Sequence, residues 1–141
     1  MTTQPPVKKS MKPLPVVDDE SAPFWKACKE HKLMIQKNMS TGTLFFYPRA
    51  IAPGDPKAKI EWAQVSGKGR VHTFTVIRQN VAPGFRDELP YVVAIIDLDE
   101  GVQMMSNIVG CAPEEVTIGM PVKVQFEDAN EEISLPKFVK S

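Results

Sequence analysis

The stretch from Leu33 to Trp62 reads LMIQKNMSTGTLFFYPRAIAPGDPKAKIEW, and its turn spacing is the most informative feature of the chain. In a four-cysteine zinc ribbon, two turns each carry a CxxC pair, because such thiolates can reach one tetrahedral Zn²⁺. The matching pairs here are Asn38/Thr41 and Ala52/Asp55, with two, then ten, then two residues between successive positions. Asn, Thr and Ala are not ligands of structural zinc sites, and one Asp cannot hold the metal alone. The stretch therefore predicts a ribbon lobe with vacated metal positions and no zinc.

The residues around these turns predict one helix and two short strands. Residues 21–31 (SAPFWKACKEH) indicate a helix, since Ser21 suits an N-cap and Pro23 suits the first helical turn. Residues 32–36 and 43–47 are predicted as strands, because both runs are apolar and a glycine-containing turn separates them.

The remainder of the chain has an all-β pattern. We expect strands at residues 60–65, 70–80, 91–98, 102–109, 122–128 and 133–139. The second of these carries an irregular alternation that predicts a bulge, and the nearly all-apolar run at 91–98 is predicted to be covered on both faces. A long loop after residue 80 and a helical turn at 111–116 favour an OB-like Greek-key barrel.

The chain divides by composition into three segments. Residues 1–17 are rich in Pro and Lys and are predicted to be a flexible arm, because they offer little apolar surface to bury. Residues 18–59 hold the helix and the degenerate ribbon, and residues 60–141 hold the barrel.

The bulk composition excludes several classes of protein. Hydrophobic residues make up 43% of the 141 residues, yet no apolar run approaches the roughly 20 residues that span a bilayer. The first residues lack the apolar core of a signal peptide, so we expect a cytoplasmic protein without membrane contact. With 17 basic and 17 acidic residues the net charge is zero, which argues against nucleic acid as the main ligand, although a local basic patch fits within a neutral total.

Five segments in a fixed order resemble a known family. They are PFW-x-ACKEHKL, YPR…EW, VSGKGRVHTFTVI, PYVVAIIDLDEGVQMMSNIVG and IGMPVKVQFED. Over about residues 23–138 they resemble the OB-fold acyl-CoA-associated proteins, also called domain of unknown function 35. The resemblance implies a mostly β protein, in which an N-terminal helix and a rubredoxin-like zinc ribbon precede an OB barrel. This chain departs from the family at all four metal positions of the ribbon.

The resemblance also implies a function. Members of this family are small partner subunits of thiolase-fold enzymes, which act as thiolases, acyltransferases or retro-aldolases on CoA thioesters, including those of steroid side-chain degradation. The chain is therefore expected to be non-catalytic by itself and to form a hetero-oligomer. It is expected to bind no covalent cofactor, and a coenzyme A thioester is the ligand that it would share with its partner.

An aromatic run suggests where that partner docks. A small lobe that lacks its metal needs other stabilisation, and a large apolar surface on a folded protein usually marks a binding site. The side chains expected at the interface are Phe24, Trp25, Leu44, Phe45, Phe46 and Tyr47. The alternative is that they fold back and seal the lobe against the barrel.

The loop at residues 81–90 is a candidate for CoA contact. Phe85 offers a stacking face for adenine, while Arg86 and the preceding Arg78 offer partners for phosphates. The same loop could instead contact the partner or cap the barrel mouth.

The two histidines, His31 and His72, cannot be tied to a nucleophile by sequence, so no catalytic residue is predicted. The alternative function is an autonomous single-stranded nucleic-acid binder, a common role of OB barrels.

Overall fold

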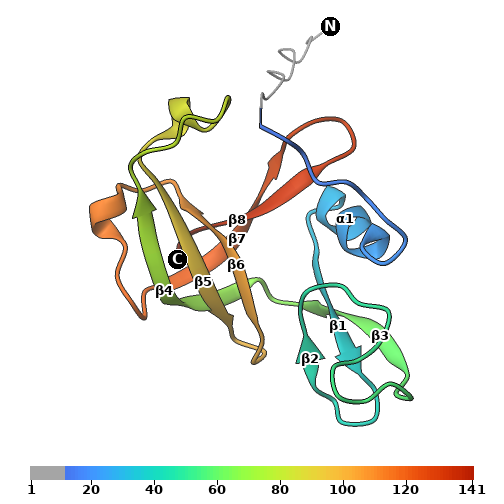
Figure 1. Ribbon diagram of the computed structural model, residues 1–141. Helices are drawn as coiled ribbons and strands as arrows, with labels where there is room; N and C mark the ends of the chain where they lie inside the picture. Colours follow the sequence, from blue (N-terminus) through green and yellow to red (C-terminus); the bar gives the residue numbers. More distant parts are fainter. Residues whose placement is uncertain (1–11) are drawn as a thin grey trace, which may run out of the picture.

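The computed structural model describes residues 12–141, and most of the predicted flexible arm, residues 1–11, lies outside them. The described chain has two parts: a helix with a three-stranded sheet, and a closed five-stranded barrel (Figure 1). This arrangement confirms the predicted mostly β fold with an N-terminal ribbon lobe. No helix in residues 12–141 is long and apolar enough to cross a membrane.

Helix α1 (Ala22–Lys29) is shorter than the predicted 21–31. Ser21 makes no side-chain cap to the helix; its backbone N–H donates instead to Oδ1 of Asp18 at 2.8 Å. At the other end His31 adopts φ 59°, a left-handed conformation in which the helix cannot continue. The buried face of α1 consists of Phe24, Ala27 and Cys28.

Strand β1 (Leu33–Asn38) is the centre of the ribbon sheet, between β2 (Leu44–Phe45) and β3 (Ile60–Val65). Both neighbours run antiparallel to it. The prediction that residues 60–65 belong to the barrel is wrong, because β3 pairs with β1 along its whole length. The alternation of apolar residues shows that a strand has a buried face, but it does not specify which sheet the strand joins.

The barrel strands follow one another in the order β4-β5-β6-β8-β7, and β7 closes back on β4. Their bounds are β4 (Lys68–Ile77), β5 (Tyr91–Leu98), β6 (Gln103–Val109), β7 (Pro121–Asp128) and β8 (Ser134–Lys140). Two short 3-10 helices, η1 (Arg86–Glu88) and η2 (Pro113–Glu115), lie in the connections. The β4–β5 register shifts between Val71 and Thr73, so the predicted bulge is confirmed. All pairings in the barrel are antiparallel except a parallel seam between β6 and β8, which is only two residue pairs long.

Strand β5 differs from the prediction that both of its faces are covered. Its residues alternate between half-buried and buried along the whole strand, so only one face points into the core. The outer face carries Val93 and Ile95, which are apolar and only partly buried. A nearly all-apolar strand can therefore arise from one core face and one apolar outer face.

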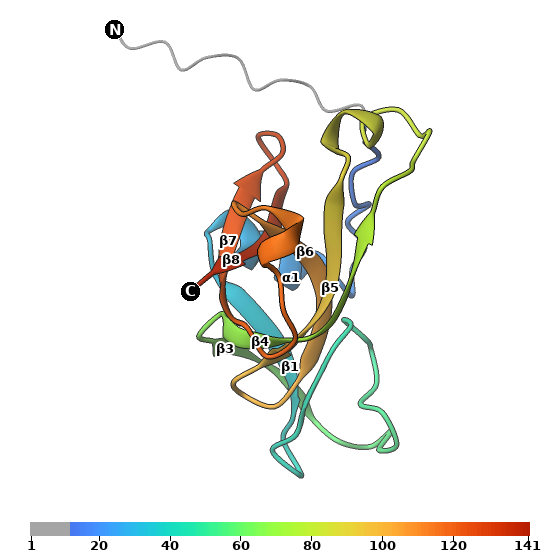
Figure 2. The ribbon, with the colours of Figure 1, turned by 90° about the vertical axis from the view of Figure 1, so that its left-hand side faces the viewer.

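One hydrophobic core joins the two parts of the molecule. It includes Phe24 and Ile35 from the lobe together with Ile96, Val122 and Phe138 from the barrel. Figure 2 shows the start of the described chain beside the loop that carries η1, where Lys12 Nζ lies 2.7 Å from a carboxylate oxygen of Glu88. The first described residues are thus fastened to the barrel rather than to the lobe.

Candidate functional site

The two turns that would hold the metal in a zinc ribbon are joined here by a hydrogen bond between Asn38 and Asp55, and further bonds order each turn. Asn38 is 6% exposed, and its Nδ2 donates to Oδ2 of Asp55 at 3.4 Å. Its Oδ1 accepts the backbone N–H groups of Ser40 at 2.8 Å and Thr41 at 3.3 Å. In the second turn Ala52 is 2% exposed, and its carbonyl accepts the N–H of Asp55. The predicted positions 38, 41, 52 and 55 therefore form one cluster, in which a buried amide occupies the first of the metal-ligand positions.

The donor set of this cluster does not fit a zinc ion. Asp55 supplies the one carboxylate, and the other three side chains are an amide, a hydroxyl and a methyl group. Across residues 12–141 no group of three or more His, Cys, Asp or Glu side chains is placed to hold a metal.

An aromatic cluster joins α1 to the end of β2. The ring centroids of Phe24 and Trp25 lie 5.0 Å apart in a T-shaped arrangement, and Phe24 lies 5.5 Å from Phe46. Phe46 in turn lies 4.2 Å from Tyr47. Aromatic pairs in this distance range stabilise each other beyond simple burial.

The six residues predicted for a partner interface divide by exposure. Phe24 (3% exposed) and Phe45 (9%) belong to the core of this chain, so they support the surface from beneath. Trp25, Leu44 and Phe46 are half-buried against that core. Tyr47 is 51% exposed and contributes the most accessible ring of the set. Part of the cluster thus seals the lobe, as the alternative interpretation expected, and part remains open.

An apolar groove of about 320 Å³ runs between this cluster and the barrel. Trp25 and Tyr47 lie on the lobe side, while Met104 and Leu135 lie on strands β6 and β8. At its rim Met105 is 54% exposed. The sequence analysis did not find the barrel side of this groove, because its residues are separated from the aromatic run by more than fifty positions and carry no motif.

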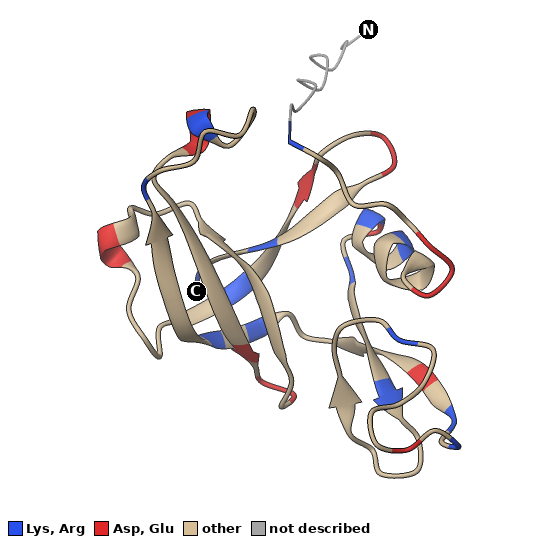
Figure 3. Ribbon diagram, viewed as in Figure 1, with Lys and Arg blue, Asp and Glu red and all other residues tan. Residues whose placement is uncertain are grey.

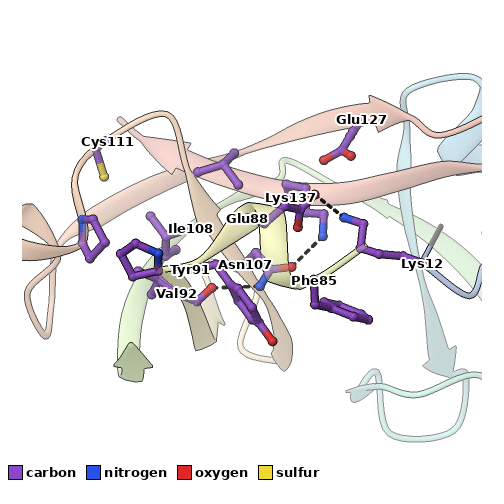
Figure 4. A pocket seen from close by; sticks show the side chains of 13 residues that line it. Lys12, Phe85, Glu88, Tyr91, Val92, Asn107, Ile108, Cys111, Glu127 and Lys137 are labelled. Atoms are coloured by element: carbon purple, nitrogen blue, oxygen red, sulfur yellow. Dashed lines mark hydrogen bonds and ion pairs between the residues drawn. The ribbon is translucent and has the colours of Figure 1, made fainter. Parts of the chain in front are cut away.

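A second, more polar hollow of about 310 Å³ lies beside η1 (Figure 4). Phe85 lines it, and the Nζ of Lys12 lies 5.8 Å from the centre of the Phe85 ring. Neither Arg78 nor Arg86 is among its lining residues. Arg78 lies 3.6 Å from Glu114 in an exposed ion pair, and Arg86 begins η1 at the surface. Of the three residues predicted to contact CoA, Phe85 is the one that lines this hollow.

Lys137 lies where the hollows meet. It lines the polar hollow, the apolar groove and a third hollow of about 430 Å³ beneath the first described residues. Its Nζ donates to Oδ1 of Asn107, and Nδ2 of Asn107 donates to the Val92 carbonyl at 2.8 Å, which fixes the amide orientation. Burial lowers the pKa of the Lys137 ammonium below its ordinary value of 10.5. Sequence reasoning missed this lysine, since nothing local distinguishes it from the other lysines.

The histidines form exposed pairs with carboxylates rather than catalytic arrangements. His31 Nε2 lies 2.9 Å from Oδ1 of Asp128, and His72 Nδ1 lies 3.0 Å from Oδ2 of Asp97. The Ser134 hydroxyl also donates to Oδ1 of Asp128. In a hydrolytic triad the histidine stands between serine and aspartate, whereas here the aspartate stands between the other two. This imidazole therefore does not accept the serine proton.

Acidic and basic residues are interspersed along the ribbon of the described chain (Figure 3). One small basic patch lies on the barrel, where Lys68 of β4 pairs across the strands with Lys123 of β7 and Arg70 lies two residues further on. All three are exposed, but three cations are few for a nucleic-acid groove.

The fold and these sites define a class of protein: an OB barrel fronted by a helix and a ribbon lobe, with an open apolar groove between them. A family model described as "ChsH2, C-terminal OB-fold domain" matches residues 62–127. A "DUF35 domain-containing scaffold protein" of Methanocaldococcus jannaschii is 40% identical over 111 residues, which cover 77% of each chain. The chain belongs to the DUF35 family.

Two further relatives carry more specific names. A "Probable enoyl-CoA hydratase alpha subunit" of Thermomonospora curvata is 34% identical over 130 residues, 92% of this chain. The present chain spans only 40% of that relative's length. Among solved structures, a chain of "Ltp2-ChsH2(DUF35) aldolase" matches with TM-score 0.81 and 31% identity, over 90% of this chain and 98% of that chain.

Proposed function

We propose that this chain is a non-catalytic partner subunit, which docks on a thiolase-fold enzyme and supports the binding or turnover of an acyl-CoA. The observation that carries the proposal is the likeness to the "Ltp2-ChsH2(DUF35) aldolase" chain, which extends over 98% of that chain. The names "scaffold protein" and "alpha subunit" among the relatives support a role in a complex. The family resemblance supplies the thiolase fold of the partner and the acyl-CoA.

The docking surface that we propose is the open side of the aromatic cluster with the rim of the apolar groove. Tyr47 and Met105 are each about half exposed, at 51% and 54%, and half-buried Trp25 of α1 lines the groove beside them. Tyr and Trp are enriched among residues that dominate binding energy at interfaces. Phe24 and Phe45 would hold these side chains in place from the core.

The test is co-expression with a thiolase-like protein of the same organism, followed by size-exclusion chromatography and a binding assay. Tyr47→Ala is expected to weaken the complex by about 2 kcal/mol, or roughly thirtyfold in Kd. Ile118→Ser is the matched control, because Ile118 is 72% exposed but is not part of this surface. Separate elution of two folded proteins, with full activity in the larger one alone, contradicts the proposal.

CoA contact through the η1 loop is proposed on the same basis. Phe85 lines the polar hollow next to Lys12, so its ring could stack on adenine while lysines face phosphates. The complex carrying Phe85→Ala should bind coenzyme A several-fold more weakly by calorimetry, and Arg86→Ala should reduce the salt dependence of binding. Unchanged affinity in both variants would assign the loop to partner contact instead.

A zinc-free ribbon is the third part of the proposal, because the donor set at positions 38, 41, 52 and 55 does not fit the metal. Metal analysis of the purified full chain is expected to show no stoichiometric zinc. The variant in which all four positions are cysteine provides the positive control, since it restores two CxxC turns.

A gel shift at low salt tests the alternative function, binding of single-stranded nucleic acid. Tight, salt-sensitive binding that Lys123→Glu abolishes would favour this alternative.

A further inference from the structure

We propose that Lys137 is an acylation site, whose side-chain amine takes acyl groups from thioesters that enter the polar hollow. The proposal rests on the proposed function in one respect: acyl-CoA is the thioester that a partner enzyme would supply. It differs in assigning this subunit a covalent role of its own, at a residue outside the predicted CoA contacts.

The geometry presents the amine to an incoming ligand. Lys137 lines three adjoining hollows, of about 310, 320 and 430 Å³, and its Nζ is bonded to Asn107, which lines the polar hollow and the apolar groove. The apolar groove offers room for an acyl chain at the same lysine. Figure 4 shows the side chain held toward Asn107, whose carboxamide is itself fixed by the Val92 carbonyl.

The charged neighbours of Lys137 leave its amine without a carboxylate contact. Glu88 is engaged by Lys12 at 2.7 Å, and no ion pair within 4.0 Å joins Lys137 to an acid of the described chain. Burial is the largest influence on its pKa and lowers it; Lys12 lowers it further, whereas Glu127 and Glu88 act in the opposite direction. A larger fraction of neutral amine follows, and the neutral amine is the nucleophile.

The reaction needs no further reagent. The nitrogen lone pair of neutral Lys137 attacks the thioester carbonyl carbon, and the tetrahedral adduct collapses with loss of the carbon–sulfur bond. The electron pair of that bond leaves on sulfur as the CoA thiolate, which takes up the proton released by nitrogen. The products are an amide on Lys137 and free coenzyme A, with no change of oxidation state.

The experiment incubates the full free chain with acetyl-CoA or octanoyl-CoA and follows acylation of each lysine by peptide mass spectrometry. Lys137 is expected to react several-fold faster than Lys123, an exposed lysine on β7. The rate at Lys137 should level off below pH 10.5, the ordinary pKa of a lysine amine, because burial lowers the pKa of this amine. Lys137→Arg removes the fast site, whereas Lys123→Arg leaves it unchanged.

Two outcomes would overturn the proposal. One is a rate at Lys137 that does not exceed the rate at Lys123. The other is loss of the fast reaction in Cys111→Ser, because Cys111 lines the same hollow and would then be the primary acceptor. Acylation is measured on the free chain, whereas complex formation is tested separately by chromatography. A negative result in either experiment therefore leaves the other one interpretable.

Discussion

At the scale of single residues, Asn38 connects the two turns that would hold the metal in a zinc-bound ribbon. Its side chain makes three hydrogen bonds across the first turn and to Asp55. Each such bond contributes about 1 kcal/mol net, whereas structural zinc contributes on the order of 10 kcal/mol in small fingers. The difference has to come from packing, and buried Leu33, Ile35 and Phe45 on the strands next to these turns supply apolar surface for it.

Asn38→Ala should therefore destabilise the chain by about 1–3 kcal/mol, because it leaves Asp55 and two backbone N–H groups without their partner. Urea unfolding measures the change. Met39→Ala is the matched control, since Met39 is the next residue and is 44% exposed. Equal stability of the two variants would mean that the amide does not hold the turn.

The Ser134–Asp128 bond gives a prediction about pH. The hydrogen bond from the Ser134 hydroxyl is the main cause that lowers the pKa of Asp128 below its ordinary 3.8, and the bond to His31 is the next largest. A lowered pKa contributes stability above pH 3.8 that is lost as the pH falls through the folded-state value. Ser134→Ala should raise the Asp128 pKa toward 3.8, which carboxyl NMR titration would measure. The difference in stability between this variant and the unchanged protein should become smaller in acid. Ser40→Ala should change neither quantity.

At the scale of elements, the close approach of β4 and β5 depends on one glycine. A Cβ atom on Gly69 would overlap the backbone oxygen of Asp97, because the two strands leave no room there for a side-chain carbon. Gly69→Ala should thus force the strands apart and cost about 1–3 kcal/mol, measured by thermal or urea unfolding. Thr75→Ala, an exposed change on the same strand, should cost far less. A tolerated Gly69→Ala would contradict this account of the barrel.

The elements also show what sequence could and could not predict. Periodicity and turn residues located the helix, the barrel strands and the bulge near Val71, because these depend on local patterns. They did not assign β3 to the lobe or show that the outer face of β5 is only partly covered, since both depend on which elements lie alongside. The same limit applies to the site. Phe85 and the aromatic run are visible in the sequence, whereas Lys137 and Met105 acquire meaning only from distant neighbours.

At the scale of the whole molecule, the lobe and the barrel share one core. Both tryptophans, Trp25 and Trp62, lie in the lobe, so their fluorescence reports on it, while far-UV circular dichroism is dominated by the barrel strands. Because core residues from both parts are in contact, we expect the two signals to change together on heating. Fluorescence that changes well before circular dichroism would show that the lobe unfolds independently.

The seam between β6 and β8, which is two residue pairs long, affects how large a ligand the molecule can bind. The parallel ladder consists of the pairs Ile108–Phe138 and Val109–Val139. Beyond it, β6 and β8 are linked by side-chain hydrogen bonds, such as the one that the Ser106 hydroxyl donates to the Pro136 carbonyl. Side-chain hydrogen bonds can break and re-form without disturbing the other ladders. We therefore expect local opening of the barrel wall at this seam. Asn107 and Lys137 border the seam and the hollows alike. Fast amide hydrogen exchange at residues 138 and 139, which pair with β6 across the seam, would identify the seam as an adjustable opening if a bulky ligand slowed it.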